Sequence, residues 1–220
     1  MPSPFENKTA RIAAFKNIDI YPVISSEFTA GRDVIDVLKS IAVGGAKIVQ
    51  IREKNKSKIE VYKLALEYRR ITAEHNMLLI INDHVDIALA VDADGVHLGQ
   101  DDLPVSAARP IAPELILGCS SHDIQEATEA EASGADYVNV GPIYPTGTKA
   151  VPCGVVGIEM LEAIKPHISI PFTVMGGIKE HHLSELFAVG ATKIAMVTEI
   201  TQAEDVTAKV NALRSHWSDR

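Results

Sequence analysis

Cysteine is scarce in this sequence of 220 residues, which contains only Cys119 and Cys153. Two thiols cannot form the disulfide framework of a small secreted protein, so we expect both to be reduced. Long apolar runs are also missing, because none approaches the roughly 18–20 residues that span a bilayer. The first residues, MPSPFENKTARIAAF, lack the basic-then-apolar order of a secretory signal. We therefore expect a soluble cytoplasmic protein that does not bind membranes.

Positive charge is in deficit as well. The chain has 21 Lys and Arg against 29 Asp and Glu, a formal net charge of −8, and no basic tract. Because nucleic-acid binding needs clustered cations, we do not expect a nucleic-acid partner. Apolar residues are plentiful at 46%, and a chain of this length can bury a core without metal ions or disulfides.

Short apolar segments alternate with longer amphipathic ones along the chain. The apolar segments are rich in Val and Ile and mostly continuous, as in parallel strands buried on both faces. Eight such strands are predicted, at 18–24, 46–51, 78–81, 95–98, 115–118, 137–140, 171–175 and 192–197. Helical patterns lie between them, at 57–75, 124–133, 156–165, 179–188 and 203–217.

Eight strands, with a helix able to follow nearly every one, predict an α/β protein with a (β/α)8 TIM barrel. An open doubly wound sheet is the alternative, but it would usually have five or six strands. We expect residues 1–220 to form one domain. Residues 1–16 would be an extra N-terminal helix that closes the barrel bottom, and residues 18–217 would form the barrel.

Polar residues follow nearly every predicted strand. A parallel barrel places its active site in the loops after its strands, so these side chains should meet at one mouth. Asp83 and Asp102 follow neighbouring strands, and two carboxylates plus substrate oxygens commonly hold Mg²⁺. Arg52, Lys54 and Lys149 are cations that suit a polyphosphate. The mouth is therefore predicted to hold a diphosphate with Mg²⁺.

A second phosphate site is predicted at the same mouth. Gly176 and Gly177 follow the seventh strand, and Val197 and Thr198 follow the eighth. Many barrels bind a phosphate at this place through backbone N–H groups. Two separate phosphate sites indicate two phosphorylated small-molecule substrates.

Each of these features also has a plainer explanation. A single Asp after a strand is more often a helix N-cap than a metal ligand. We expect Asp86, Asp92, Asp94 and Asp101 to be caps or solvated turn residues, and His97 to be a hydrogen-bonded barrel residue. The convergence of separate segments on one mouth favours the functional interpretation for the other residues.

Five segments together resemble the thiamine-phosphate synthase family. They read QIREK at 50–54, IINDHVDIALAVDADGVHLGQDDLP at 80–104, GCSSH at 118–122, GADYVNVGPIYPTGTK at 134–149 and GGI at 176–178. The resemblance extends from about residue 18 to residue 210. It implies a Mg²⁺-dependent transferase that couples 4-amino-2-methyl-5-hydroxymethylpyrimidine diphosphate to 4-methyl-5-hydroxyethylthiazole phosphate and releases pyrophosphate.

The resemblance also implies roles for individual positions. The pyrimidine diphosphate would be bound by polar side chains after the second to sixth strands: Gln50, Arg52, Lys54, Asn82, Ser120 and Lys149. The thiazole phosphate would lie against Thr146, Thr148, Gly177, Val197 and Thr198. Asp83 and Asp102 would hold Mg²⁺. Arg52, Ser120 and Lys149 would act in catalysis.

The sequence departs from the family pattern at the thiazole-phosphate end. Gly147 stands between two threonines where the family has proline, and Thr198 stands where serine is commoner. Glu199 follows where a small residue is usual. A carboxylate beside a bound phosphate is unfavourable unless it points away.

Two other functions remain open beside the transferase. A related thiazole tautomerase shares the barrel, but it needs no diphosphate clamp of paired acids and cations. A non-catalytic sensor of phosphate ligands could use the same scaffold. For the transferase, neither Cys119 nor Ser120 is marked as a covalent nucleophile. Mg²⁺ and the three cations favour departure of pyrophosphate, so we predict a dissociative path through a pyrimidine cation. The sequence is also compatible with a homo-oligomer.

Overall fold

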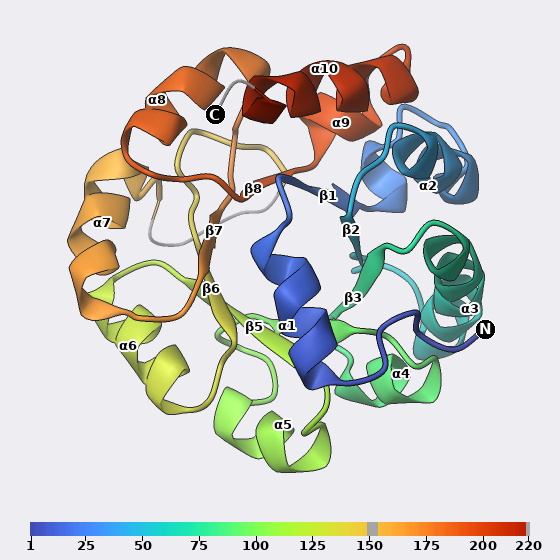
Figure 1. Ribbon diagram of the computed structural model, residues 1–220, viewed down its shortest axis with the longest axis horizontal. Coiled ribbons are helices and arrows are strands. Elements are labelled where there is room, and N and C mark those ends of the chain that lie inside the picture. Colours follow the sequence, from blue (N-terminus) through green and yellow to red (C-terminus); the bar gives the residue numbers. More distant parts are fainter. Residues whose placement is uncertain (149–153, 219–220) are drawn as a thin grey trace.

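The computed structural model, which describes residues 1–148 and 154–218, is a closed barrel of eight parallel strands (Figure 1). The strands pair in chain order, and β8 closes the ring on β1. Their bounds are β1 (Ile20–Ile24), β2 (Ile48–Ile51), β3 (Leu78–Asn82), β4 (Gly95–Leu98), β5 (Ile116–Ser121), β6 (Tyr137–Val140), β7 (Phe172–Val174) and β8 (Ile194–Met196). The predicted α/β class and TIM barrel are confirmed.

Helices surround the ring of strands (Figure 1). The α-helices after the first strand are α2 (Val34–Val43), α3 (Lys58–Glu74), α4 (Val85–Ala90), α5 (Val105–Ile111), α6 (Ile124–Ala132), α7 (Gly157–Ile164), α8 (Leu183–Ala188), α9 (Thr198–Thr201) and α10 (Val206–Ser218). Three short 3-10 helices add to them: η1 (Ser26–Phe28), η2 (Lys165–His167) and η3 (Glu180–His182). The segment predicted as one helix at 179–188 is therefore η3 followed by α8.

The N-terminal extension is helical only in its second half. Helix α1 (Lys8–Lys16) starts after Asn7, whose Oδ1 accepts the Ala10 N–H at 3.0 Å. Residues 1–7 are not helical, so the prediction of a helix over 1–16 is too long. Helix α1 crosses the open end of the barrel in Figure 1. The side chain of Phe15 packs on Tyr137 with ring centroids 4.5 Å apart, which closes the barrel bottom as expected.

Side chains along each strand alternate between two cores. One set faces the surrounding helices and forms the larger cluster, to which Val49, Ile81 and Cys119 belong. The other set faces the barrel interior, where Tyr21, Ile48, Ile80, Ile116 and Tyr137 pack with residues of α1. Because β5 extends to Ser121, Ser120 lies inside a strand and on the inward-facing set, whereas Cys119 faces the helices.

A buried ion pair ties α3 to the strands. The carboxylate of Asp94 is fully buried and accepts hydrogen bonds from Arg69 Nη1 at 2.8 Å and from the Leu79 N–H at 2.7 Å. Arg11 of α1 adds a contact from its Nε at 3.4 Å. The prediction that Asp94 is a cap or solvated turn residue is wrong, because arginines distant in the sequence compensate its charge.

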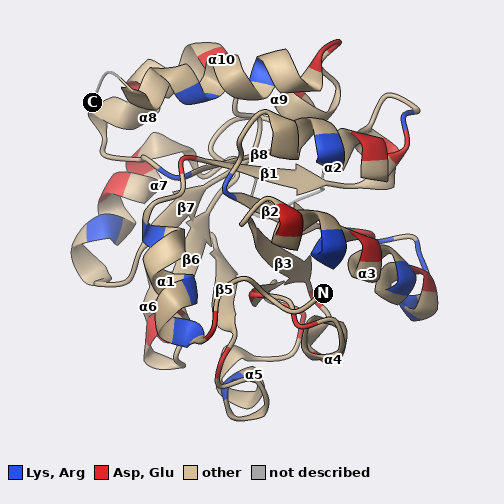
Figure 2. Ribbon diagram, turned by 45° about the vertical axis from the view of Figure 1, so that its right-hand side comes forward, with Lys and Arg blue, Asp and Glu red and all other residues tan. Residues whose placement is uncertain are grey.

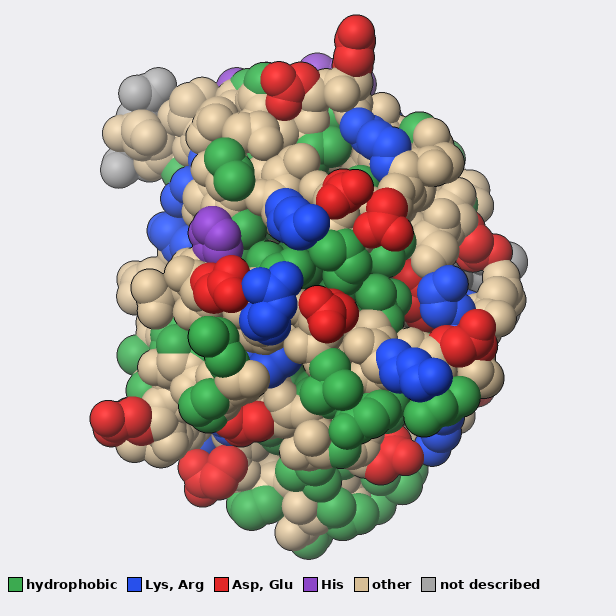
Figure 3. Space-filling view, turned by 90° about the vertical axis from the view of Figure 1, so that its right-hand side faces the viewer, with side chains coloured by type: hydrophobic (Ala, Val, Ile, Leu, Met, Phe, Trp, Pro, Cys, Tyr) green, Lys and Arg blue, Asp and Glu red, His purple; other side chains and the backbone are tan. Residues whose placement is uncertain are grey.

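Charges of both signs lie on the outer helices (Figure 2). On the face shown in Figure 3, Lys and Arg side chains are interspersed with Asp and Glu. None of the helices in the described part of the chain is both long and apolar enough to cross a membrane.

We predict that Arg69→Met lowers the free energy of unfolding by about 3 kcal/mol, because it removes the nearer of the two arginines that compensate the buried Asp94 carboxylate. The matched control is Arg70→Met, which breaks an exposed pair with Glu74 and should cost less than about 1 kcal/mol. Urea unfolding of both variants measures the difference. Equal losses in the two variants would contradict the assigned role of Arg69.

Candidate functional site

Two cavities open side by side at the carboxyl ends of the strands. Five residues line both cavities: Arg52, Ser120, Asn139, Met175 and Ala195. These residues come from four different strand ends and the loop after β2, so the barrel itself brings the cavities together. Ligands in the two cavities would meet across this shared wall.

The first of the two cavities, which we call the acidic cavity, is lined by residues that the sequence analysis predicts for the pyrimidine diphosphate and Mg²⁺. Its lining includes Gln50, Arg52, Lys54, Asn82, Asp83, Asp102 and Ser120. Lys54 Nζ lies 2.5 Å from Asp83 Oδ2, and the Gly99 N–H donates to Asp102 Oδ2 at 2.6 Å. A carboxylate pair with adjacent cations therefore forms one wall of this cavity.

The two carboxyls of the acidic cavity influence each other directly. Burial raises the pKa of Asp83, the Asp102 carboxyl adds to this rise, and Lys54 opposes it. Burial also acts to raise the pKa of Asp102, but hydrogen bonds from Asp83 and from the Gly99 amide outweigh it and lower the pKa. The Asp102 carboxylate therefore opposes ionisation of Asp83, and a bound cation would relieve this repulsion.

The acidic cavity fits Mg²⁺ by its donor chemistry. The described residues contain no group of three or more His, Cys, Asp or Glu side chains arranged to hold a metal ion. Mg²⁺ does not need such a cage, because it is usually held by one or two carboxylates, water and substrate phosphate oxygens. Asp83 and Asp102 are the two carboxylates that could hold Mg²⁺ in this cavity.

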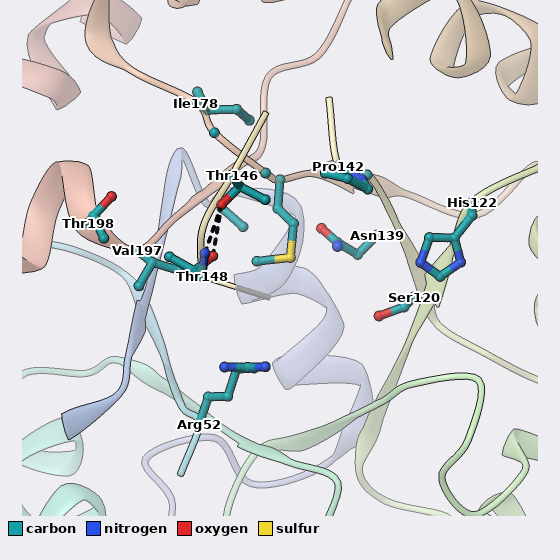
Figure 4. A pocket seen from close by; sticks show the side chains of 15 residues that line it. Arg52, Ser120, His122, Asn139, Pro142, Thr146, Thr148, Ile178, Val197 and Thr198 are labelled. Atoms are coloured by element: carbon teal, nitrogen blue, oxygen red, sulfur yellow. Dashed lines mark hydrogen bonds between the residues drawn. The ribbon is translucent and has the colours of Figure 1, made fainter. Parts of the chain in front are cut away.

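The second cavity, which we call the threonine cavity, is lined by residues that the sequence analysis predicts for the thiazole phosphate (Figure 4). Its lining includes Thr146, Thr148, Gly177, Val197 and Thr198, and it shares Arg52 and Ser120 with the acidic cavity. Thr146 and Thr148 are joined by a hydrogen bond of 3.0 Å between their hydroxyls. Figure 4 shows both threonines near Val197 and Thr198, with Arg52 across the cavity.

Glycine is required at positions 176 and 177 by both conformation and space. Gly176 has φ +100° and Gly177 has φ +63°, a region that other residues rarely adopt. A Cβ on Gly177 would lie 2.3 Å from the Pro145 carbonyl oxygen. The Gly-Gly pair therefore lets the loop after β6 approach the end of β7 and form the threonine cavity.

Glu199 does not line either cavity in the described structure. Its carboxylate contacts Lys179 Nζ and Lys209 Nζ, each at 3.3 Å. Lys179 Nζ also lies 3.5 Å from the Thr198 hydroxyl. Two lysines therefore pair with the Glu199 carboxylate outside the threonine cavity.

Every predicted site residue within the described ranges lines one of the two cavities. Lys149 lies outside the described residues, as does Cys153. Several lining residues were not predicted: Tyr21, His97, Asn139, Met175 and Ala195. Most of them are inward-facing positions within or directly beside strands, and the continuous apolar pattern of a strand buried on both faces does not mark which alternate residues face inward.

A parallel barrel with these features at its mouth is typical of enzymes that bind phosphorylated small molecules. The family model described as thiamine monophosphate synthase matches residues 20–200. The chain belongs to this family.

Individual relatives agree with the family assignment. A thiamine-phosphate synthase of Pelotomaculum thermopropionicum is 47% identical, with 90% of this chain and 91% of the relative covered. One of Shouchella clausii is 44% identical, with 90% and 95% covered. The solved thiamine phosphate pyrophosphorylase from Pyrococcus furiosus has a TM-score of 0.84 at 35% identity, with 92% and 96% covered. A 3-hexulose-6-phosphate synthase, at 18% identity and a TM-score of 0.63, shares the fold alone.

We predict that Gly177→Ala destabilises the protein by at least about 1 kcal/mol more than Gly31→Ala does. Both glycines have positive φ, so both variants carry backbone strain. Only at position 177 does the new Cβ also meet backbone atoms, because Gly31 has no atom within 4 Å of that position. Thermal unfolding of the two variants isolates the steric cost, and matching losses would refute the close approach at Gly177.

Proposed function

We propose that this protein is a Mg²⁺-dependent transferase that couples the aminopyrimidine diphosphate to the thiazole phosphate, giving thiamine phosphate and pyrophosphate. The observation that carries the proposal is the pair of cavities that meet at Arg52, Ser120 and Asn139. One cavity has the charges for a diphosphate and a cation, and the other has hydroxyls for a monophosphate. Relatives named thiamine-phosphate synthase support it. We place its action on these small molecules in the cytoplasm, with no membrane or nucleic-acid partner.

In the proposed complex, the acidic cavity binds the pyrimidine diphosphate. Arg52 and Lys54 pair with diphosphate oxygens, and Ser120 donates a hydrogen bond to them. Gln50 and Asn82 are amide side chains at 4% and 9% exposure on the inner wall, where they can hold the pyrimidine ring by hydrogen bonds. When bound at Asp83 and Asp102, Mg²⁺ would neutralise charge on the diphosphate. Lys149 is proposed to stabilise the departing pyrophosphate.

The thiazole phosphate is proposed to bind in the threonine cavity. The hydroxyls of Thr146, Thr148 and Thr198 can donate to its phosphate oxygens, beside Gly177 and Val197. This arrangement would hold the thiazole nitrogen toward the shared wall, close to the pyrimidine methylene carbon. Holding both partners in place reduces the entropy cost of their reaction.

We propose that the carbon–oxygen bond of the pyrimidine diphosphate breaks before the new bond forms. The electron pair leaves with pyrophosphate, and the aminopyrimidine carries the positive charge until the thiazole nitrogen donates its lone pair. The thiazole nitrogen is a neutral nucleophile, so no side chain has to remove a proton from it. Arg52, Lys54 and Lys149 favour departure of the anion, which is the step that ionisation requires.

The acidic cavity also argues against the tautomerase, and an assay separates the transferase from the sensor. A thiazole tautomerase has no use for a carboxylate pair facing Lys54 and Arg52, because its substrate carries no diphosphate. A sensor would bind both ligands without converting them. A steady-state assay with both substrates separates the three functions: we expect one pyrophosphate released for each thiamine phosphate formed. Binding without release would favour the sensor, and isomerised thiazole phosphate alone would favour the tautomerase.

We predict that Asp83→Asn and Asp102→Asn each lower activity by about 10²-fold or more, because each removes one carboxylate of the proposed Mg²⁺ site. The matched control is Asp101→Asn, an exposed neighbour that lines the same cavity and should retain most activity. Circular dichroism checks that all three variants fold. Full turnover of the unmodified enzyme in excess chelator would contradict the proposed metal dependence.

We predict that a strongly electron-withdrawing group on the pyrimidine, similar in size to the natural methyl, slows the chemical step by several orders of magnitude. The reason is that ionisation places nearly a full positive charge on the ring system, whereas direct displacement places little charge there. Single-turnover measurement of the chemical step gives the answer. A slowing of only a few-fold would indicate concerted displacement.

A further inference from the structure

Five side chains form a continuous hydrogen-bonded row inside the barrel, which we call the interior row. Gln50 Nε2 donates to Tyr21 Oη at 2.9 Å, and the two phenol oxygens of Tyr21 and Tyr137 are 3.2 Å apart. Tyr137 Oη lies 3.0 Å from His97 Nδ1, and His97 Nε2 lies 3.0 Å from Ser120 Oγ. The row crosses β2, β1, β6, β4 and β5 and ends at the wall shared by both cavities.

The interior row is almost fully buried, although Gln50, Tyr21 and His97 border the acidic cavity. Gln50, Tyr21, Tyr137 and His97 are between 0% and 5% exposed. Burial raises the pKa of both Tyr21 and Tyr137, so each phenol keeps its single proton at neutral pH. Each phenol can therefore donate one hydrogen bond only, and the direction of one bond determines the direction of the next.

The Gln50 amide determines the direction of the whole row. Its nitrogen faces Tyr21, so the Tyr21 oxygen accepts this bond and its own proton goes to Tyr137. Tyr137 then donates to His97 Nδ1, which leaves the proton of the neutral imidazole on Nε2. This N–H donates to Ser120 Oγ.

The opposite direction is costly with this amide orientation. If His97 Nδ1 donated to Tyr137 and Tyr137 donated to Tyr21, the Tyr21 oxygen would accept two bonds. Its own proton would then have no acceptor among the described residues. An unsatisfied buried donor costs about 1–3 kcal/mol.

We infer that Tyr21, Tyr137 and His97 are positioning residues. Because the Gln50 amide donates at one end of the row, each following side chain also donates to the next, and Ser120 accepts at the other end. Because Ser120 accepts from His97, its own hydroxyl proton is available to a ligand in the mouth. This ligand is an anionic phosphate oxygen, an assignment that depends on the proposed function. Gln50, which lies on β2, thus determines that the Ser120 hydroxyl on β5 donates its proton to the ligand.

The direct test is the position of the His97 proton in the ligand-free protein. Nitrogen NMR of histidine-labelled protein at mildly alkaline pH, where imidazole is neutral, distinguishes the two tautomers. A His97→Asn variant identifies the His97 signals. We expect the proton on Nε2, and a proton on Nδ1 would overturn the inference. Because no substrate is present, this result is independent of the activity assay.

A sharper test is to reverse the direction of every hydrogen bond in the interior row. In Gln50→Glu the ionised carboxylate can only accept, so Tyr21 must donate to it and every following bond reverses. We expect the His97 proton to move to Nδ1, at a pH where carbon NMR shows that the new carboxyl is ionised. A proton that stays on Nε2 would refute the coupling.

Tyr68→Phe is the control for general loosening of the core. Tyr68 is also fully buried, but its hydroxyl has no hydrogen-bond partner among the described residues. This variant should leave the His97 tautomer unchanged. A tautomer change in Tyr68→Phe would show that general loosening of the core moves the proton, and would overturn the assigned path.

A double-mutant cycle tests the consequence for Ser120. Ser120→Ala should weaken binding of inorganic pyrophosphate with Mg²⁺ by about 10-fold, the effect of one lost hydrogen bond to a charged group. In the Gln50→Glu background the Ser120 hydroxyl donates to His97 instead of to the ligand. There, Ser120→Ala should weaken pyrophosphate binding by less than about 2-fold. Equal losses in both backgrounds, measured by calorimetry, would contradict the donor role of Ser120.

Discussion

Closure of the parallel sheet between β1 and β8 is the constraint on which the rest of the structure depends. The pairs Ile20↔Ile194 and Tyr21↔Ala195 close the ring, so every inward-facing side chain meets others from across the barrel. The register places Asn82 beside His97 and Ser120 beside Asn139. Residues from distant parts of the sequence therefore line one mouth without needing a loop to bring them there.

The closed interior also separates a sealed bottom from a polar top. Phe15 of α1 packs on Tyr137 and closes the lower end of the barrel. Above this seal, the row from Gln50 to Ser120 satisfies buried polar groups that would otherwise destabilise the core. The same side chains that complete the core thus orient the floor of the functional site. Stability and ligand recognition share these residues.

Much of the site could be predicted from the sequence because the strands and their first following residues are contiguous. Asp83, Asp102 and Lys54 each follow a strand, and the structure places all three around one cavity. Asn139 and Met175 could not be found in this way, since their contribution depends on which alternate residues of a strand face inward. The inward register is set by the pairing with neighbouring strands, which the local pattern of a buried strand does not reveal.

Other features depend on partners that are far away in the sequence. Asp94 resembles a turn residue locally, yet Arg69 and Arg11 make it a buried ion-pair member. In the sequence alone, the negative charge of Glu199 is unfavourable for a phosphate nearby. In the structure, Lys179 and Lys209 pair with this carboxylate. In both cases the environment of a carboxylate depends on tertiary contacts with residues far away in the sequence, which short motifs do not encode.

The central claim is that the two cavities hold two different phosphate groups on either side of Arg52, Ser120 and Asn139. A crystal structure of the protein with thiamine phosphate, pyrophosphate and Mg²⁺ tests it most directly. The account predicts pyrophosphate and Mg²⁺ beside Asp83, Asp102 and Lys54, and the thiamine monophosphate beside Thr146, Thr148 and Gly177. A structure with these two phosphate positions exchanged, or with both groups in one cavity, would contradict the account.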